Sequence, residues 1–453
     1  MGTQSIGSLL AKLSIPAMVG MLVNALYNLV DTIFVGQGVG PLAIASLSIA
    51  FPIQMIIGGF AQMYGMGAAS IISRKLGEKR RDEAADAAGT AIMLTIITAL
   101  LITLTGLIFI HPILRIFGAT AAIIPYASDY LGIVLFGAVF LSFSMCSNNI
   151  IRSEGAAKYA MMVMVIGTGM NLILDPIFIF GFHMGVKGAA AATVISQISG
   201  ASFALRFFVQ KRSSIPFQRS SFRIKPSLAW ESIKLGTPAL VRQTGTSIMV
   251  LTVNNMLRIY GGDLAIAACG MIIKLMTFFL MPMFGIVQGF QPIAGYNYGA
   301  QKFDRVKEVL QKSIWVTSVM GLFSMLIIEL FPRTLLSMFT HDKALLVLAA
   351  PALQIVMVTI PFIGLQTIGS ALFQSIGKSV PALILGLSRQ FILLIPLVLI
   401  LPNFFGLQGV WASFPIADTF ATLITAVWLS FEIKHLNRIH FESLNPVERY
   451  PKN

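Results

Sequence analysis

The sequence predicts an all-α membrane protein with twelve transmembrane helices in two six-helix lobes. Hydrophobic residues make up 56% of the 453-residue chain and charged residues only 11%. Soluble domains carry roughly a quarter charged residues, so this composition excludes an ordinary soluble fold. The apolar runs last about 20 residues or more, which suits a membrane-spanning helix and is about twice the length of a β-barrel strand. An internal duplication divides the runs into two sets of six.

The first apolar segment runs from about Ser14 to Phe34. It lacks a short hydrophobic region followed by a small-residue cleavage site, so we interpret it as the first span rather than as a cleavable signal. The twelve predicted spans cover residues 14–36, 43–72, 88–111, 125–150, 158–181, 186–210, 232–257, 264–295, 312–332, 345–375, 380–402 and 407–433.

Basic residues predict the orientation of these spans. Lys and Arg are concentrated in the loops after the second, sixth and eighth spans, at 74–81, 211–225 and 302–307. Short cytoplasmic loops carry such an excess, so both termini should be cytoplasmic and the protein should lie in the cell membrane. The net charge of +14 follows from this bias, with acidic headgroups opposite it, so no nucleic-acid partner is needed to explain it.

The duplication appears as one ungapped displacement of 222 positions that spans about 150 residues. It predicts a first lobe at 1–210 and a second at 229–433, joined by a basic cytoplasmic linker at 211–228 and followed by a cytoplasmic tail at 434–453. With six spans each, the lobes share one orientation, as in parallel-repeat transporters. The displacement takes Lys12, Leu13 and Pro16 onto Lys234, Leu235 and Pro238, and Ser153, Gly155 and Ala160 onto Ser375, Gly377 and Ala382.

A polar stripe marks the fifth span. Thr168, Asn171 and Asp175 recur at spacings of three and four, so they share one helix face. Pro176 follows the acid and cannot donate to the carbonyl of Leu172, which favours a kink there. An ionisable side chain in a span costs roughly 2.5 to 3.5 kcal/mol and indicates a functional site by default. The alternative is a carboxylate that binds a neighbouring helix purely for packing.

The first span carries a second acid. Asp31 shares a helix face with Asn24 and Asn28, and the second lobe has no acids at the equivalent positions. Asp31 and Asp175 should each lie about 8 Å below the outer end of their helix at 1.5 Å per residue. Two carboxylates close together in a low-dielectric site cannot both stay charged without a large cost in free energy. At least one should take up a proton, or the pair should hold Na⁺ together with Asn171.

Three further polar residues are candidates for the same site. Asn148 lies on the fourth predicted span, Thr193 on the sixth, and Tyr130 at the outer start of the fourth. Tyr130 has the alternative role of an interfacial aromatic, and Thr193 that of a hydroxyl that packs two helices together.

The second lobe has its own intramembrane charges, Lys274, Arg389 and Asp418. Because a charged side chain is costly inside the membrane, we expect these residues to pair with one another as a structural ion pair. Contact with the substrate or a proton relay is the second interpretation. Met281 and Phe284 belong to a Met- and Phe-rich run that either lines a permissive pocket or packs ordinarily against lipid and core.

Enzymatic chemistry is not indicated. The five histidines lie in loops or the tail without metal-ligand spacing, and there is no Walker-type glycine-rich loop for ATP. We therefore expect no catalytic residues and no cofactor beyond a coupling ion.

Several motifs together resemble the multidrug and toxic compound extrusion (MATE) transporters. They are Val30-Asp31-Thr32-Ile33-Phe34-Val35-Gly36, Arg152-x-x-Gly155, Asn171-x-x-x-Asp175-Pro176 and the 6+6 duplication. The resemblance implies antiport of organic, often cationic compounds against H⁺ or Na⁺. Some members carry acids on the seventh and tenth helices. Here Glu231 lies only at the entry of the seventh span and the tenth span has no acid, so the resemblance does not extend to a cation site in the second lobe. The implied ion-coupling residues are Asp31, Tyr130, Asn148, Asn171, Asp175 and Thr193.

The sequence therefore predicts a monomeric efflux antiporter that binds an amphipathic organic cation between its lobes. An alternative is a flippase of a lipid-linked oligosaccharide or related lipid. It needs a broad cationic cleft, for which Lys274 and Arg389 are the only obvious candidates. A receptor without transport would leave the duplication unexplained. The candidate substrate-cleft residues are Asn24, Asn28, Lys274, Arg389, Met281 and Phe284.

Overall fold

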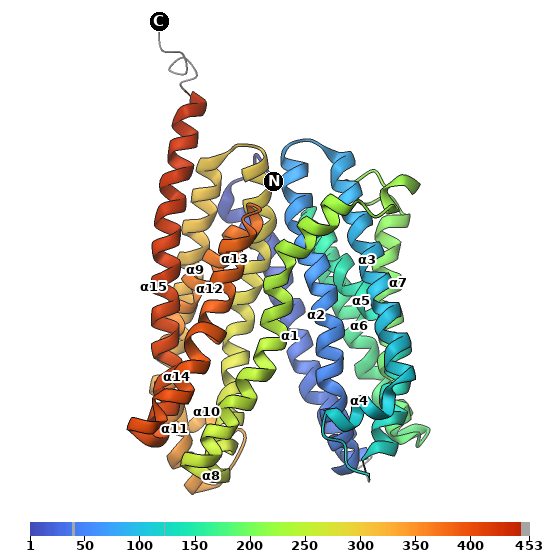
Figure 1. Cartoon of the computed structure of the whole chain (residues 1–453), viewed down its shortest axis with the longest axis vertical. Helices are drawn as coiled ribbons and strands as arrows, with labels where there is room; N and C mark the ends of the chain where they lie inside the picture. The colour runs from blue at the N-terminus through green and yellow to red at the C-terminus, as the bar shows by residue number, and fades with distance from the viewer. Residues whose placement is uncertain (39–40, 122, 445–453) are drawn as a thin grey trace, which may run out of the picture. The chain divides into compact units, whose positions relative to one another are not determined.

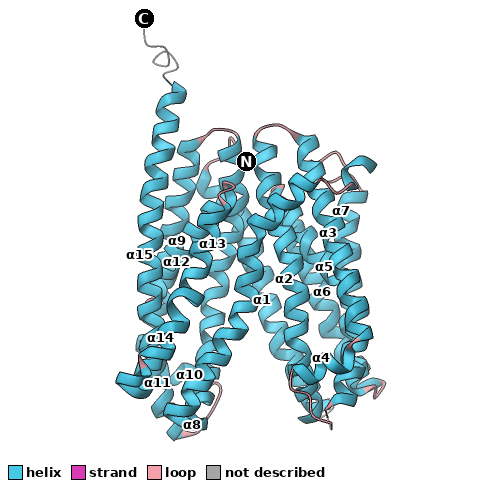
Figure 2. Ribbon diagram, viewed as in Figure 1, coloured by secondary structure: helices cyan, strands magenta, loops and turns pink. Residues whose placement is uncertain are grey.

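The computed structural model describes residues 1–38, 41–121 and 123–444, apart from the side chains of 27–33, 35–38, 41–45, 440 and 442–444. All secondary structure in this part of the chain is helical (Figure 2). The predicted site residues Asn28 and Asp31 lie on the first helix, but their side chains are outside the described part.

The first half of the chain supplies six long helices (Figure 1). A short helix, α4 (Ile110–Ile116), lies between the third and fourth of them, and a π-helical turn, η1 (Ile177–Gly181), continues the fifth. The linker that follows holds the single turn η2 (Arg219–Phe222). The long helices are α1 (Ile6–Gly38), α2 (Pro41–Gly77), α3 (Arg81–Ile108), α5 (Ile124–Ser153), α6 (Ala157–Pro176) and α7 (Gly185–Val209).

The second half is more broken. Helix α8 (Pro226–Gly299) contains Gly262 in a non-helical conformation, with φ 65° and ψ −164°, which divides it into two spans. Helices α11 (Lys343–Met357) and α12 (Ile360–Ser375) form one span bent by 44°. The remaining elements are α9 (Phe303–Leu330), α10 (Pro332–Ser337), α13 (Ser379–Leu387), the π-helical η3 (Ser388–Leu394), α14 (Ile395–Ile400) and α15 (Pro402–Leu444).

These helices confirm the predicted fold class. Within the described residues, 10 helices are long and apolar enough to cross a membrane, and 11 if the bent pair counts as one span. Division of α8 at Gly262 brings the total to the twelve expected from the sequence. Several spans run two or more turns beyond the predicted apolar segments, because polar first and last turns continue the helix outside the hydrocarbon region.

The repeat is visible in local geometry as well as in sequence. Gly155 and Gly377, which are 222 positions apart, both adopt the left-handed conformation, with φ 89° and 87°. In each case the next amide donates to the carbonyl five residues earlier, from Ala156 to Ile151 and from Lys378 to Phe373. This is a Schellman helix end, and glycine adopts it without the steric cost of a Cβ.

A side-chain bond recurs at the same displacement. The Asn148 amide donates to the carbonyl of Ala160 at 2.7 Å, and the Ser370 hydroxyl donates to the carbonyl of Ala382 at 3.4 Å. In both halves a polar side chain thus ties the end of one span to the first turn of the next. This agreement supports the duplication independently of the residue identities.

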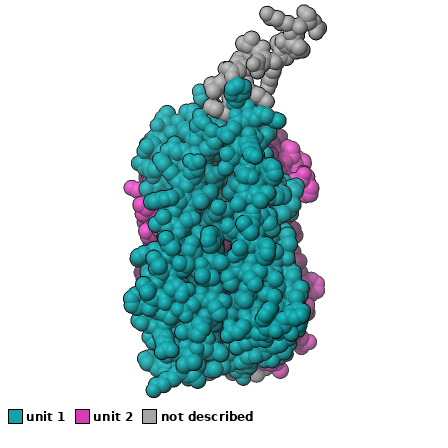
Figure 3. Space-filling model, turned by 90° about the vertical axis from the view of Figure 1, so that its left-hand side faces the viewer, with its two compact units in different colours: residues 1–11, 73–79, 248–453 teal, residues 12–72, 80–247 magenta. Residues whose placement is uncertain are grey.

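The chain forms two compact units, coloured separately in Figure 3. Unit 1 comprises Met1–Ala11, Ser73–Lys79 and Ile248–Asn453, and unit 2 comprises Lys12–Ile72 and Arg80–Ser247. Each unit therefore takes segments from both sequence halves. The lobe boundaries given above divide the chain by its repeat rather than by these contacts, and they stay a prediction.

Glycines explain why 73–79 belongs to unit 1. A Cβ on Gly77 would lie 2.1 Å from the carbonyl oxygen of Tyr296, and a Cβ on Gly299 would lie 2.1 Å from that of Arg74. Tyr296 and Arg74 are themselves 222 positions apart, so the two contacts are repeat-related. The ends of α2 and α8 approach so closely that only glycine fits at either position.

Candidate functional site

The polar stripe of the fifth span lies where α6 changes to π-helical geometry. Helix α6 ends at Pro176, and η1 continues directly from Ile177 to Gly181. Proline lacks the amide that would continue the α-helical ladder, and single π turns occur frequently at functional sites. The kink predicted from Pro176 is thus a change of helix type immediately after Asp175.

The stripe itself is buried. Asp175 is 0% exposed, Asn171 2% and Thr168 9%, in agreement with the shared face predicted from their spacing. The Asn171 Nδ2 donates to Asp175 Oδ1 at 3.3 Å. A carboxyl group removed from water in this way needs hydrogen-bond partners, a counter-charge or a proton.

Tyr130 and Thr193 lie near the level of this carboxyl group. Tyr130 is 6% exposed and packs in one apolar cluster with Ile179 and Ala189. Ile179 is one turn beyond Asp175, and the Thr193 hydroxyl donates to the carbonyl of Ala189 at 2.9 Å. Side chains from α5, α6, η1 and α7 therefore meet at one end of unit 2.

Gln54 is a member of this region that the sequence reasoning missed. Its Nε2 donates to the Tyr130 hydroxyl at 3.3 Å, which connects α2 to α5. The available signal was an amide side chain within the apolar run of the second span, which also holds Gln62. Amides inside spans bind across helices, because the alternative is an unsatisfied polar group in hydrocarbon.

Asn148 is not brought to this site. It lies near the far end of α5, where its amide donates to the carbonyl of Ala160 and its Oδ1 accepts from Arg152 at 3.3 Å. Ala160 and Asp175 are separated along α6 by about 22 Å at 1.5 Å per residue. The structure therefore gives Asn148 a role in the connection between α5 and α6.

The first helix passes beside the same end of α6. The ring of Phe34 meets that of Phe180 edge-on, with centroids 6.3 Å apart. Asn24 is half-buried about three turns before Phe34 on α1. The side chains of Asn28 and Asp31 are outside the described residues, so the predicted Na⁺ site that includes Asp31 stays a prediction. In the described part of the chain, no three His, Cys, Asp or Glu side chains gather as a metal site would require.

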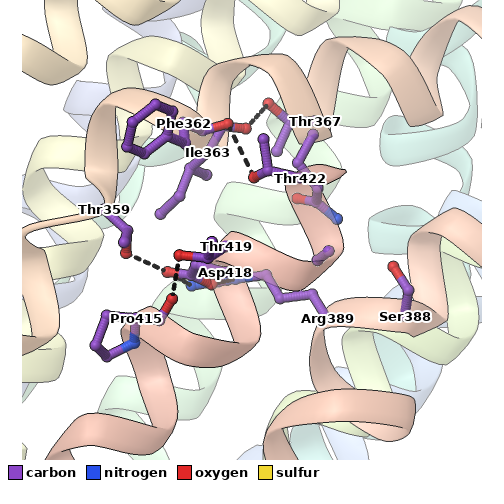
Figure 4. Close-up of polar contacts among 12 residues, drawn as sticks. Thr359, Phe362, Ile363, Thr367, Ser388, Arg389, Pro415, Asp418, Thr419 and Thr422 are labelled. Atoms are coloured by element: carbon purple, nitrogen blue, oxygen red, sulfur yellow. Dashed lines mark hydrogen bonds and ion pairs between the residues drawn. The ribbon is translucent and has the colours of Figure 1, made fainter. Parts of the chain in front are cut away.

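In unit 1, Arg389 and Asp418 form the ion pair predicted from their cost (Figure 4). Arg389 Nε lies 2.5 Å from Asp418 Oδ1, and Thr359 Oγ1 donates to Asp418 Oδ2 at 3.2 Å. Asp418 is 4% exposed. The contact joins η3, α15 and the break between α11 and α12, which indicates a structural role.

The other proposed cleft residues of unit 1 all lie on α8 and differ in exposure. Lys274 is exposed on α8 and Met281 is half-buried. Phe284 packs against the core cluster of this unit beside the buried Met283. For Phe284 the structure thus favours ordinary core packing, the alternative left open above.

Comparison with known proteins supports the resemblance seen in the motifs. Multidrug export protein MepA of Staphylococcus aureus is 28% identical over 410 residues, 90% of each chain, and MepA of Staphylococcus haemolyticus is 28% identical over 444 residues, 98% of this chain and 97% of that one. A solved outward-facing multidrug resistance MATE family transporter of the MOP superfamily matches with a TM-score of 0.91 at 28% identity, over 96% of this chain and 97% of the other.

The two repeats are also matched separately. The MatE family model covers residues 16–177 and 238–400, one segment in each half of the chain. The resemblance is therefore confirmed in both halves of the chain, with the first five spans of each set matched. The members of this family are transporters rather than enzymes. The chain belongs to the MatE family of membrane transporters.

Proposed function

We propose that this chain exports multiple organic compounds, mostly amphipathic cations, in exchange for H⁺ or Na⁺. The names of its MepA relatives and of the multidrug resistance transporter support the export of several compounds. The observation that carries the ion coupling is the fully buried Asp175 carboxyl beside the Asn171 amide. A carboxyl group in this position responds to an arriving proton or Na⁺, because burial makes its charged form costly and either ion lowers that cost.

The helix around Asp175 supplies a means of coupling. The α-to-π change at Pro176 leaves a helix with two nearby hydrogen-bonding registers, and the Phe34–Phe180 contact ties η1 to α1. Ion binding at Asp175, with Asp31 as the proposed second acid, would repack these segments. The two conformations would then differ in ion affinity, which is what exchange requires.

The proposed setting is the cell membrane with both termini in the cytoplasm, as the basic loops indicate. We propose that the chain acts as a monomer, because two fused repeats already supply the pair of lobes. The flippase alternative loses support, since it relied on Lys274 and Arg389 for a cationic cleft and Arg389 is neutralised by Asp418.

The test is uptake of a fluorescent cationic dye into inverted membrane vesicles, driven separately by a pH gradient and by a Na⁺ gradient. We expect one gradient to drive uptake in the wild type and neither to do so in Asp175→Asn. Full dye transport with unchanged ion dependence in that variant would exclude Asp175 as the coupling group.

Asp129→Asn is the matched control. Asp129 lies one residue before Tyr130 and makes an exposed ion pair with Lys187 at 3.3 Å. The substitution therefore removes a carboxylate from the same end of the same unit as Asp175. Exposed pairs of this kind contribute about 0 to 1 kcal/mol. The control should therefore keep the gradient dependence of the wild type.

A further inference from the structure

A groove outside the candidate site lies where α15 passes the turn between α12 and α13. Its volume is about 300 Å³. It belongs entirely to unit 1 and combines aromatic with ionisable side chains. The lining residues that matter here are Phe373, Trp428, Phe431, Lys378, Glu432 and His435.

The groove lies at a boundary between apolar and charged sequence. Asp418 is the one charged residue of 404–431, whereas Glu432, Lys434 and Arg438 follow within the next two turns of α15. A transmembrane helix changes composition in this way where it leaves the hydrocarbon. Within unit 1 this end of α15 lies at the same end as the first residues of the chain (Figure 1).

The ionisable side chains give the groove an edge with hydrogen-bond donors. Lys378 Nζ lies 2.8 and 2.6 Å from the two oxygens of Glu432, and the Glu432 side chain is only 7% exposed. The pair neutralises itself, and an ammonium group has three N–H donors, of which this contact uses two. His435 lines the same groove, and Lys434 is exposed on the same helix.

The aromatic side chains give it an apolar edge. The rings of Phe373 and Trp428 meet edge-on with centroids 6.1 Å apart, and Phe431 is 65% exposed. Tryptophan is enriched at the level of lipid headgroups because its ring is amphipathic. A ligand that fits both edges has an anionic head and an apolar body.

The duplication acts as an internal control for this chemistry. The last span of each half is displaced by 221 positions, since Gly185 and Gly406 at its start share the left-handed conformation, with φ 58° and 57°. The positions equivalent to Lys378, Trp428, Glu432 and His435 therefore hold Ala156, Phe207, Lys211 and Ser214. The fold is thus built once without an ion pair or a tryptophan at this level. The groove is a property of the second half rather than a requirement of the architecture.

We propose that this groove binds the headgroup of an anionic phospholipid from the leaflet at that end of the molecule. The phosphate would accept from the remaining Lys378 N–H and from His435, and the acyl chains would lie along Trp428 and Phe431. Basic pockets between helices on the cytoplasmic side of membrane proteins bind anionic headgroups in this way. The inference goes beyond the proposed function and does not depend on which ion is coupled.

The test uses protein in which Trp428 is the only tryptophan, after Trp230, Trp315 and Trp411 are changed to phenylalanine. It is reconstituted with phosphatidylcholine or phosphatidylglycerol brominated on the acyl carbons nearest the headgroup. We expect the phosphatidylglycerol to quench Trp428 at about one fifth of the mole fraction that phosphatidylcholine needs. Lys378→Met/Glu432→Gln, which leaves no orphaned charge, should abolish this preference, and His435→Ala should reduce it.

Trp230 provides the matched control as the only tryptophan of a second protein. It is 59% exposed and has Lys234 Nζ 5.0 Å from its ring centre, but it does not line the groove. The preference should be absent there. Equal quenching of Trp428 by both lipids would overturn the proposal, and so would relief of the quenching by inorganic phosphate, which would indicate a soluble anion as the occupant.

Discussion

Asp175 and Asp418 are both withdrawn from water within membrane-spanning helices, but they meet different partners. Asp175 in unit 2 accepts from the neutral Asn171 amide, and Asp418 in unit 1 accepts from the Arg389 guanidinium and the Thr359 hydroxyl. A guanidinium holds a carboxylate ionised in one geometry. A neutral amide does not hold a carboxyl group in its charged form in this way. The comparison therefore sets a structural acid, Asp418, against the acid proposed for ion coupling, Asp175.

The local helix geometry sharpens this difference. Both acids lie in regions with π-helical turns, since η1 begins two residues after Asp175 and η3 carries Arg389. In unit 1 the π turn is fixed by an ion pair to α15, whereas in unit 2 it is held by the apolar cluster around Ile179. Apolar contacts are less directional than an ion pair, so we expect the π turn of unit 2 to be the one that rearranges.

The largest effect should come from Arg389→Met. It leaves the Asp418 carboxylate buried without its counter-charge, which costs about 3 to 5 kcal/mol. The measurement is the thermal unfolding midpoint of purified protein in detergent. Arg389→Met/Asp418→Leu should recover most of the loss, because it removes both charges. An unchanged midpoint in the single variant would contradict a structural role for the pair.

A smaller loss should follow from Thr359→Val. It deletes the hydroxyl that donates to Asp418 Oδ2, and the loss of a buried hydrogen bond to a charged group costs about 1.5 to 3 kcal/mol. Thr422→Val is the matched control, because its hydroxyl donates to the neutral carbonyl of Phe362 at 3.4 Å. Equal destabilisation of the two variants would show that the charge of Asp418 does not strengthen the bond.

On the unit 2 side, Asn171→Leu should change ion dependence more than stability. Loss of the amide that donates to Asp175 is worth about 1 kcal/mol, or about fivefold in the ion concentration for half-maximal transport. Met170→Leu, at the exposed neighbouring position, should leave that concentration unchanged. A shift of the same size in both variants would assign the effect to helix packing.

The smallest expected effect concerns the turn between α5 and α6. Glu154 accepts from the Ser213 hydroxyl at 2.8 Å and from the Ser214 amide at 2.6 Å, which attaches the linker to this turn. Burial raises the pKa of the Glu154 carboxyl from 4.5 to about 7, and the hydrogen bonds offset part of that rise. The attached state therefore binds more protons than the detached state.

The sign of the pH effect follows from this raised pKa. Attachment should weaken as the pH rises from about 4.5 to 7 and stay constant above that range. Hydrogen exchange at residues 213–215, corrected for the intrinsic effect of pH, measures it. Glu154→Gln should remove the dependence, and strengthening of attachment with rising pH in the wild type would contradict the assignment.

Much of this architecture could be predicted because membrane segments obey strong constraints. Helix length follows from bilayer thickness, and the cost of intramembrane charges singled out Asp175 as a buried group and the pairing of Arg389 with Asp418. The same argument was wrong for Lys274, which is exposed on α8 and does not join the pair. The stripe of Thr168, Asn171 and Asp175 could be predicted because helical periodicity depends only on local sequence.

The rest depends on contacts that spacing does not encode. Asn148 was grouped with Asp175 by its polar character, although it lies at the opposite end of α5 from Tyr130. The contribution of 73–79 to unit 1 depends on the close approach of Gly77 to Tyr296, which pairs residues distant in sequence. The groove beside Trp428 likewise combines the turn between α12 and α13 with α15, which follows about 50 residues later in the chain.

The most direct measurement compares Asp175→Asn with Arg389→Met/Asp418→Leu in gradient-driven dye transport at matched amounts of folded protein. If Asp175 couples the ion and Asp418 is structural, the first variant loses gradient-driven accumulation and the second keeps the ion dependence of the wild type. Gradient-driven transport that survives in Asp175→Asn but is lost in the neutral-pair variant would contradict this assignment and place the coupling group in unit 1.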